Sequence, residues 1–342
     1  LYQKLLQLII ISLLICLIAI IFGIGVGSIY IHPMDVIEIL MHNFFSIPIS
    51  ADISETSISI VWKLRLPRTI IAFIVGGALA VSGTVMQSVL KNPLASSYTL
   101  GVSSGASVGA AIVIVTGFTI PLLNMLTLPF VGLLCGLLTV YLSVKFASRM
   151  DSNMENNTII LVGMVFSLFI NAILTLITAI AREHVTQLTY WQMGSFASKD
   201  WSVIAILFPI VIIGVIWLMR YSQELDIMTF GEEQAFTMGI DVPQLKWLLL
   251  GLAAALTGSA ISFVGVIGFI DLIAPHVVRR IFGSSHKIVI PMSMLFGGAF
   301  MVLCDLAART IASPSELPVG SITALIGAPF FAYIYFSKRK DK

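Results

Sequence analysis

Charged side chains are scarce in this sequence, and those inside apolar runs are the ones that could do chemistry. Arg65 and Arg68 flank Pro67, and Asp305 precedes Arg309 by four residues. Residues four apart share one face of a helix, so Asp305 and Arg309 can form an ion pair. The arginines could instead bind carboxylates of a partner protein or extend to lipid headgroups. The residues alone leave these alternatives open.

A second group of ionisable residues lies within the apolar stretch 267–281, which contains Asp271, Pro275 and His276. Ionisable residues at membrane depth are functional candidates. Pro275 predicts a broken helix, a feature that lines protein-buried or water-filled cavities. His276 on its own offers no constellation for a metal. We interpret it as a structural histidine that bonds a carbonyl group freed by the proline.

Neither a metal site nor a nucleotide site is predicted. The cysteines lie inside apolar runs, and their spacing fits neither a zinc site nor a disulfide framework. We interpret them as buried free thiols; they are Cys16, Cys135 and Cys304. The sequence has no Gly-x4-Gly-Lys-[Ser/Thr] phosphate-binding loop. We therefore expect no cofactor and no enzymatic activity, and the ATPase of any ATP-driven pump must be a separate chain.

The composition places the chain in a membrane. Of its 342 residues, 58% are hydrophobic and 11% are charged, whereas a soluble domain carries about 25% charged residues. So few charges cannot cover a core of this size, and lipid must solvate much of the surface. A bilayer-crossing helix needs roughly 20 mostly apolar residues. Ten segments qualify: 5–28, 67–89, 99–118, 124–146, 158–181, 201–220, 245–265, 267–281, 288–311 and 319–337.

We therefore predict an all-α polytopic membrane protein with about ten transmembrane helices in a single domain, 1–342. The eighth segment is the weakest, and nine spans is the competing count. The first apolar run is longer than the core of a signal peptide, so we interpret it as a retained span. Gly132 and Gly136 are four apart. Such small residues let helices approach closely, and packing within one bundle is preferred over a dimerisation motif.

The lysines and arginines orient these spans. When ten spans alternate across the bilayer, most basic residues fall on the side that holds both termini. Basic residues favour the cytoplasmic side, so both termini are expected in the cytoplasm. The connection 221–244 then lies inside. Arg65, Arg68 and Arg309 lie outside, as exceptions to the charge bias.

Two inner connections carry further patterns. Asn92-Pro93 is a turn signal after the second span. In residues 230–239, the acidic residues Glu232 and Glu233 are accompanied by the apolar residues Phe230, Phe236 and Met238, and Gly239 is a plausible helix stop. A short helix there could dock into a groove of a cytoplasmic partner, or it could be an idle surface helix.

Together these segments resemble the FecCD family of ABC transporters, the permeases of iron-complex and cobalamin importers. The resemblance extends from about residue 20 to 337, and its pieces are specific only in this order and spacing. Its carriers are Arg65 to Arg68 with Gly83 and Gln87; Asn92-Pro93-Leu94-Ala95; Leu100-Gly101 and Gly105-Ala106; Trp191, Gly194, Ser195 and Trp201; residues 231–239; Gly268-Phe269 and Pro275-His276; Asp305 and Arg309; and Glu316-Leu317-Pro318, Gly320, Gly327 and Pro329.

The resemblance implies a type II ABC importer permease fold. Two permease subunits, identical or different, would surround one pathway, with two ATPase subunits inside and one substrate-binding protein outside. The family's docking arginines, which pair with glutamates of the binding protein, look like Arg65, Arg68 and Arg309. Its inner gate resembles the positions of Asn92 and Leu94. Its coupling helices, which insert into the ATPase, look like residues 225–240, with Gly231, Glu232, Glu233, Ala235 and Gly239 as the matching positions.

One position departs from this pattern, because the family usually has glycine where this chain has Asp271. The carboxylate could pair with a cation on its own or a neighbouring helix, or it could face the pathway. Asp271 and Asp305 are the only two acidic residues inside the predicted spans.

The sequence thus predicts a permease subunit of an ATP-driven importer in a bacterial cytoplasmic membrane. Its expected substrate is an iron complex, first a ferric siderophore, with haem or cobalamin as alternatives. The competing class is a secondary transporter, which keeps coupling carboxylates near the midplane, often in inverted repeats. No internal repeat is visible here. The net charge of +2 is too small to indicate nucleic acid as a partner.

Overall fold

Helices dominate the computed structural model, which describes residues 2–27, 29–50 and 53–337. No strand occurs in these ranges, and the all-α prediction is confirmed. The elements are α1 Tyr2–Gly25, α2 Pro33–Phe45, α3 Glu55–Ser59, η1 Ile60–Arg65, α4 Leu66–Val89, η2 Ser97–Leu100, α5 Val102–Thr116, η3 Asn124–Leu126, α6 Thr127–Met150, α7 Asn156–Ile180, η4 Arg182–His184, α8 Val185–Met193, α9 Trp201–Arg220, α10 Ser222–Phe230, α11 Glu232–Thr237, α12 Val242–Val264, α13 Ile270–Phe282, α14 His286–Thr310 and α15 Val319–Ser337.

Each of the ten expected spans contains one of these helices. In the described residues, seven helices are long and apolar enough to cross a membrane, and α5 and α15 are shorter apolar helices. The remaining segment, 267–281, forms α13, which has only 13 residues. A crossing helix needs roughly 20, so α13 does not cross a bilayer by itself, in line with its rank as the weakest segment.

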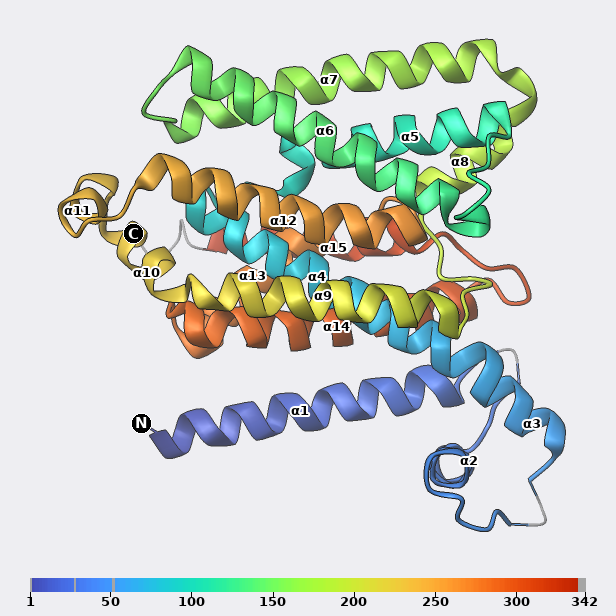
Figure 1. Cartoon of the computed structure of the whole chain (residues 1–342). Helices are drawn as coiled ribbons and strands as arrows, with labels where there is room; N and C mark the ends of the chain where they lie inside the picture. The colour runs from blue at the N-terminus through green and yellow to red at the C-terminus, as the bar shows by residue number, and fades with distance from the viewer. Residues whose placement is uncertain (1, 28, 51–52, 338–342) are drawn as a thin grey trace.

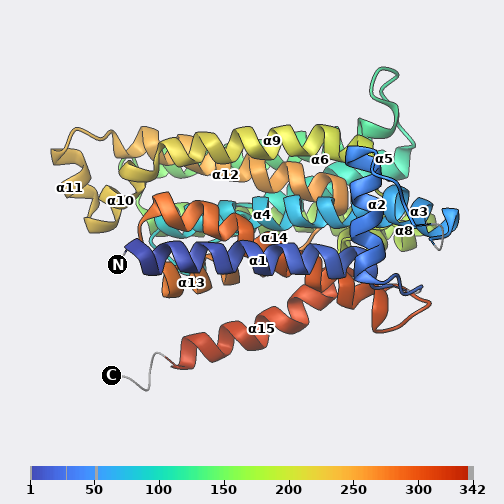
Figure 2. The same cartoon turned by 90° about the horizontal axis from the view of Figure 1, so that it is seen from below.

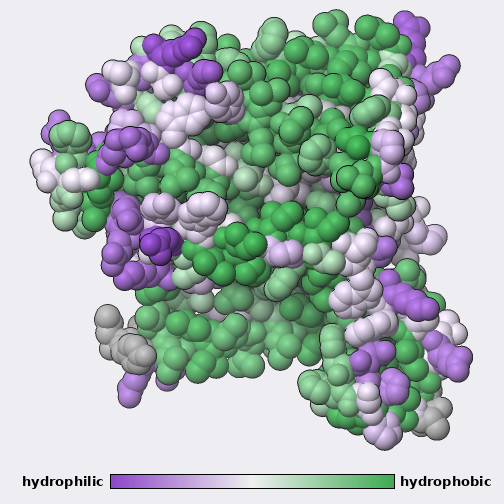
Figure 3. All heavy atoms as spheres, in the orientation of Figure 1, coloured by the Kyte–Doolittle hydropathy of each residue, from purple (hydrophilic) through white to green (hydrophobic). Residues whose placement is uncertain are grey.

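The core of the bundle is α4. Most of its residues are buried, and it packs against α12, α13 and α14 (Figure 1). In contrast, α1, α7 and α9 expose many large apolar side chains. Lipid is the only solvent in which such surfaces are stable. Figure 3 shows the resulting hydrophobic band, with hydrophilic residues gathered at the two ends of the helices.

The two ends of the bundle carry different elements. The start of α1 and the end of α15 lie at the same end as α10 and α11, whereas α2 and α3 lie at the opposite end (Figures 1 and 2). The relative placement of the termini and of segment 221–244 is therefore the one that the distribution of basic residues predicts. We call the end with α10 and α11 the coupling end, and the other the α2–α3 end.

The glycine pair of α6 packs within the chain, as interpreted from the sequence. A Cβ atom on Gly136 would lie 2.9 Å from the carbonyl oxygen of Val102 in α5, and one on Gly105 would lie 2.6 Å from that of Cys135. Both distances are below any normal contact. These glycines therefore allow α5 and α6 to approach closely within one subunit.

The predicted break at Pro275 is wrong in position. Helix α13 runs through Pro275, and the interruption lies before it, between α12 and α13. There Gly265 and Phe269 adopt left-handed conformations, with φ of +84° and +70°. Pro275 cannot bond the carbonyl of Asp271 four residues earlier, but the side-chain amide of Gln87 donates to that oxygen at 3.2 Å. A neighbouring helix thus satisfies the freed carbonyl, and α13 stays intact.

Candidate functional site

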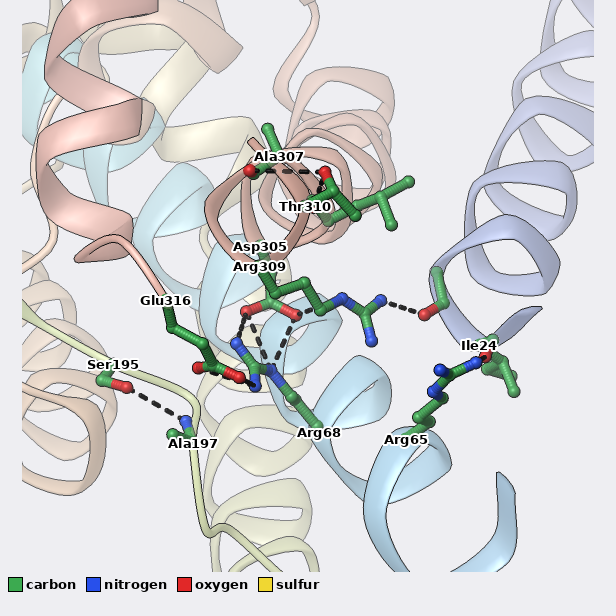
Figure 4. A network of polar contacts seen from close by, with 12 residues as sticks. Ile24, Arg65, Arg68, Ser195, Ala197, Asp305, Ala307, Arg309, Thr310 and Glu316 are labelled. Atoms are coloured by element: carbon green, nitrogen blue, oxygen red, sulfur yellow. Dashed lines mark hydrogen bonds and ion pairs between the residues drawn. The ribbon is translucent and has the colours of Figure 1, made fainter. Parts of the chain in front are cut away.

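Arg68, in the first turn of α4, sits between two carboxylates. Its Nε and Nη2 atoms donate to Asp305 of α14 at 3.0 and 2.8 Å, and its Nη1 atom donates to Glu316 at 2.8 Å (Figure 4). The side chain of Arg68 is 11% exposed and that of Asp305 is 1% exposed, whereas Glu316 is 43% exposed. The fork of the guanidinium group suits such double binding.

Arg65 and Arg309 converge on the end of α1. Nη1 of Arg65 donates to the carbonyl oxygens of Ile24 and Gly25 at 3.1 and 2.8 Å. Arg309 donates to the carbonyl of Gly23 (Figure 4). The last carbonyls of a helix lack partners within it and carry partial negative charge, so cations stabilise them.

Arg309 also pairs with Asp305, as its spacing predicts. Its Nε atom lies 3.7 Å from Oδ2 of Asp305. That Nε atom has no hydrogen-bond partner among the described residues. Asp305 therefore faces two guanidinium groups, those of Arg68 and Arg309.

A cavity of about 380 Å³ adjoins this cluster at the α2–α3 end. Its lining includes Arg65, Arg68, Arg309, Lys199 and Glu316. Burial lowers the pKa of the Lys199 ammonium, and the nearby Asp200 carboxylate acts in the opposite direction. With one carboxylate against four basic side chains on its wall, the cavity is suited to receive an anionic group. We call it the arginine cavity.

The structure thus brings together the three arginines that resemble docking residues. It also shows that all three are largely buried and already bound by groups of their own chain. A partner carboxylate could reach them by entering the arginine cavity or by replacing Glu316 at Arg68. The docking role stays a prediction.

Asn92 and Leu94 lie in a tight turn at the coupling end of α4. The Asn92 side chain accepts the backbone N–H of Leu94 at 2.9 Å, and its carbonyl accepts that of Ala95 at 3.0 Å. Lys91 before it is left-handed, with φ of +48°. The turn predicted from Asn92-Pro93 is confirmed. Leu94 is 48% exposed, and its gate role is an untested prediction.

Asp271 is buried in the first turn of α13, with 2% exposure. Its carboxylate oxygens have no hydrogen-bond partner of normal geometry among the described residues, although Ser96 approaches them. Pairing with a cation is one of the two alternatives predicted for Asp271, and no lysine or arginine forms an ion pair with it in the described part of the chain. His276, half-buried in the next turn, has an interaction partner. The carbonyl that Pro275 frees is taken by Gln87.

The short helix expected within 230–239 is present as α11, and a second short helix, α10, precedes it. Gly231, with φ of +146°, separates α10 from α11, and Gly239, with φ of +85°, follows the end of α11. Glu232 pairs with the buried Lys246 of α12 at 2.9 Å. Ala235 is buried and Glu233 is exposed. Three large apolar side chains face outward at this end: Phe230, Phe236 and Met238.

A groove of about 780 Å³ runs beside the second half of α7, and both polar and apolar side chains line it. Asn171, Thr175 and Thr178 follow one another at steps of four and three residues, which places them on one face of α7. Arg182 of η4 and Gln192 of α8 add polar groups, and Leu174, Ala179 and Val185 add apolar ones. We call this surface the α7 groove; it was not among the predicted sites, although the spacing of Asn171, Thr175 and Thr178 is visible in the sequence.

Glu316, Asp226 and His286 were also missed as interacting residues. Glu316 binds Arg68, and Asp226 in α10 binds His286 in α14 at 2.5 Å. Glu316 stood in a matched motif without a role. For the pair of Asp226 and His286, 60 residues apart, the sequence offered no signal.

Comparisons with known proteins agree on one family. The model of the FecCD transport family matches residues 14–337. The chain is 38% identical over 323 residues to the uncharacterized ABC transporter permease protein YvrB of Bacillus subtilis, covering 94% of this chain and 91% of that one. It is also 38% identical over 293 residues to the cobalamin import system permease protein BtuC of Halobacterium salinarum, covering 85% and 77%. Other relatives are named for hemin, Fe(3+) dicitrate and molybdate.

A solved structure has the same fold. It is an inward-facing conformation of an ABC transporter assigned to the metal-chelate type. Its TM-score to this chain is 0.83 at 28% identity, and the match covers 97% of this chain and 99% of the other.

Proposed function

The chain belongs to the FecCD transport family, and from this premise we propose that it imports a ferric siderophore. As a member it is the permease of an ABC importer of the metal-chelate, siderophore, haem or cobalamin type, and such subunits are not themselves enzymes. Membership also sets aside the competing class of ion-coupled secondary transporters. The siderophore assignment, the partners and the orientation are the parts that go beyond membership.

The α7 groove carries the substrate proposal. An exposed stripe with Asn171 and Arg182 is costly against hydrocarbon, so it faces water or another subunit rather than lipid. Threonine hydroxyls and side-chain amides suit a chelate whose surface offers many oxygen atoms. A flat tetrapyrrole such as haem would gain more from an apolar wall. The groove therefore supports a siderophore over haem as the cargo.

The partners follow the two ends of the bundle. We place an extracytoplasmic binding protein at the α2–α3 end, where the arginine cavity is suited to carboxylates. We place the ATPase at the coupling end, where exposed Phe236 and Met238 suit insertion into a cleft. A second permease subunit would close the α7 groove. Both termini are then cytoplasmic, in a bacterial cytoplasmic membrane.

Transport in proteoliposomes tests the substrate. The complex of this chain with its ATPase and binding protein should transport radioactive iron from a ferric siderophore across the vesicle membrane. Transport should require ATP on the side of the membrane that holds the ATPase. Haem and cobalamin serve as competing cargoes in parallel vesicles. Uptake of cobalamin or haem without uptake of siderophore iron would contradict the proposal while leaving the family assignment intact.

A further inference from the structure

His286 joins two helices that lie far apart in the sequence. It is the first residue of α14, and its side chain is 1% exposed. Its Nδ1 atom lies 2.5 Å from Oδ1 of Asp226 in α10, and its Nε2 atom lies 2.6 Å from Oγ of Ser88 in α4. Both ring nitrogens of this buried histidine are therefore engaged, one by the coupling segment and one by the end of α4.

The carboxylate determines the direction of the first contact. A carboxylate only accepts, so Nδ1 carries the hydrogen that points to Asp226. The hydroxyl of Ser88 has one hydrogen and two acceptors within reach, Nε2 of His286 at 2.6 Å and the carbonyl oxygen of Thr84 at 2.9 Å. The oxygen of Ser88 accepts in turn from Nη2 of Arg279 in α13 at 2.9 Å. Contacts at both nitrogens fix the orientation of the ring.

Arg279 extends the contacts to the turn at Asn92. Its Nη1 atom donates to Oε1 of Gln87 at 2.6 Å. The backbone carbonyl of Gln87 accepts the N–H of Asn92 at 3.2 Å. A continuous series of contacts thus runs from α10, in the segment expected against the ATPase, to the first residues of the expected inner gate.

Capping of α14 does not require this ring. Asp226 also accepts the backbone N–H of His286 at 2.9 Å, and that bond alone satisfies an open N–H of the first helical turn. An alanine at position 286 would keep it. The other anchor of the coupling segment, the pair of Glu232 and Lys246, holds α11 to α12 and to the carbonyl of Met154.

We propose that His286 is a positioning residue that couples the position of α10 to that of the 91–95 turn, through Asp226, Ser88 and Arg279. The proposal rests on the proposed function, because it needs an ATPase that displaces α10. Packed interiors have discrete arrangements rather than a continuum. A displacement of α10 that separates Asp226 from His286 would release one side of the ring, weaken its contact with Ser88 and so loosen the end of α4.

The test reads the gate turn directly and needs no substrate. Leu94→Cys serves as the reporter in the complete complex in membranes, after the native cysteines are replaced by alanine; these are Cys16, Cys135 and Cys304. The rate of thiol labelling is measured with and without a non-hydrolysable ATP analogue. The nucleotide should change this rate by about fivefold or more in the parent, as usual for coupled sites.

His286→Ala and Ser88→Ala should each reduce that change to less than about twofold, and the double variant should lose no more than either single one, because the residues act in series. Ser143→Ala is the matched control, since Ser143 is buried in α6 and its hydroxyl has no hydrogen-bond partner among the described residues. It should keep the full response. The thermal stability of every complex is measured alongside.

A full nucleotide response in stable His286→Ala and Ser88→Ala complexes overturns the inference. If His286→Ala does not assemble, Ser88→Ala decides alone, because it removes a single hydroxyl group. A parent complex in which residue 94 does not respond contradicts the gate role of the 91–95 turn and, with it, the inference. Failure of the proposed function is read separately, as absence of siderophore uptake in proteoliposomes, so the two failures are told apart.

Discussion

Two buried aspartates of this chain differ in what surrounds them. Asp305 faces Arg68 and Arg309, whereas no lysine or arginine forms an ion pair with Asp271 among the described residues, and only Ser96 and backbone N–H groups of the first turn of α13 approach its carboxylate. A buried charge is tolerated when it is paired and is costly when it is not. We therefore expect the two aspartates to contribute differently to stability.

Asparagine at each position should separate these cases. Asp305→Asn removes the carboxylate that Arg68 and Arg309 share and leaves Arg68 with Glu316 alone. Removal of one partner from a buried pair costs about 3–5 kcal/mol. Asp271→Asn should leave stability unchanged or raise it. Thermal unfolding of the purified chain in detergent measures both. An equal loss of stability in the two variants would show that the Asp271 carboxylate has a partner that stabilises it as much as the arginines stabilise Asp305. Such a partner could be a group supplied by another subunit.

Glu316 offers a sharper test of docking than the arginines do. Substitution of Arg68 or Arg309 would break pairs inside the chain, so loss of function would be ambiguous. Glu316 is half exposed, and if a carboxylate of the binding protein must take its place at Arg68, Glu316→Gln should tighten binding by up to about fivefold, the value of an exposed pair of at most 1 kcal/mol.

The affinity of the reconstituted complex for its binding protein gives the answer. Glu183→Gln, which removes an exposed carboxylate from η4 after α7, serves as control and should change nothing. Unchanged or weakened binding in Glu316→Gln would mean that Arg68 does not exchange partners, and that the arginines serve only to hold the ends of α1, α4 and α14 together.

Whether a contact between two side chains can be predicted from the sequence depends on how many residues separate them. A spacing of four residues predicted the pair of Asp305 and Arg309, because helix geometry is local. The shorter contact of Asp305 with Arg68 joins residues 237 positions apart, and no local pattern specifies it. The same holds for the two contacts of His286.

At the scale of elements, α13 shows that a proline in the sequence can predict a helix interruption without predicting its position. Pro275 predicted an interruption, which occurs, but at residues 265–269 rather than at the proline. The reason is the side chain of Gln87, which supplies the hydrogen bond that the proline cannot. Compensation from a neighbouring helix is a tertiary effect and leaves no trace in the local sequence.

The approach of α13 to α4 depends on one glycine. A Cβ atom on Gly83 would lie 1.9 Å from the carbonyl oxygen of Asp271, whereas one on Gly251 of α12 would meet nothing within 4 Å. Gly83→Ala should therefore destabilise the chain by about 1–3 kcal/mol through overpacking. Gly251→Ala should be neutral or stabilising by about 0.5–1 kcal/mol.

Thermal unfolding of both variants in one detergent provides the comparison. Because the substitution is chemically identical and both glycines lie inside helices, helix propensity cancels between them. A Gly83→Ala variant as stable as Gly251→Ala would mean that α13 is not packed on α4 in the manner described.

The coupling segment can be tested through its exposed residues. Glu233→Cys lies on the solvent-facing side of α11, next to the exposed Phe236. It should crosslink to a cysteine in the ATPase cleft and should not react with an impermeant thiol reagent applied outside the cell. Labelling from outside would invert the orientation of the whole chain, and with it the docking assignment.

At the scale of the whole molecule, the distribution of polar surface separates lipid from water. Large apolar side chains cover α1 and α9, and the exposed face of α7 alternates between two kinds of surface. Leu176 is 63% exposed and apolar, whereas its neighbour Thr175 lines the α7 groove. Successive helical residues point about 100° apart, so one helix presents one face to lipid and another to the proposed pathway. Composition alone predicts the membrane, and only the fold shows which face is polar.

Single cysteine substitutions at the neighbouring positions 175 and 176 therefore report which face of α7 is accessible to water. Thiolates form in water and not in hydrocarbon, so Thr175→Cys should react with an impermeant thiol reagent in the assembled complex, and Leu176→Cys should react far more slowly. The native cysteines are replaced in both variants, and the extent of labelling is read by mass spectrometry.

If the groove is a pathway wall closed by a second permease subunit, modification of Thr175→Cys should block uptake, and excess ferric siderophore should slow its labelling. Equal labelling at the two positions would mean that α7 lies against lipid on both faces. Labelling at Thr175→Cys without any loss of uptake would place the pathway elsewhere in the molecule, because a bulky group in a narrow conduit cannot be bypassed.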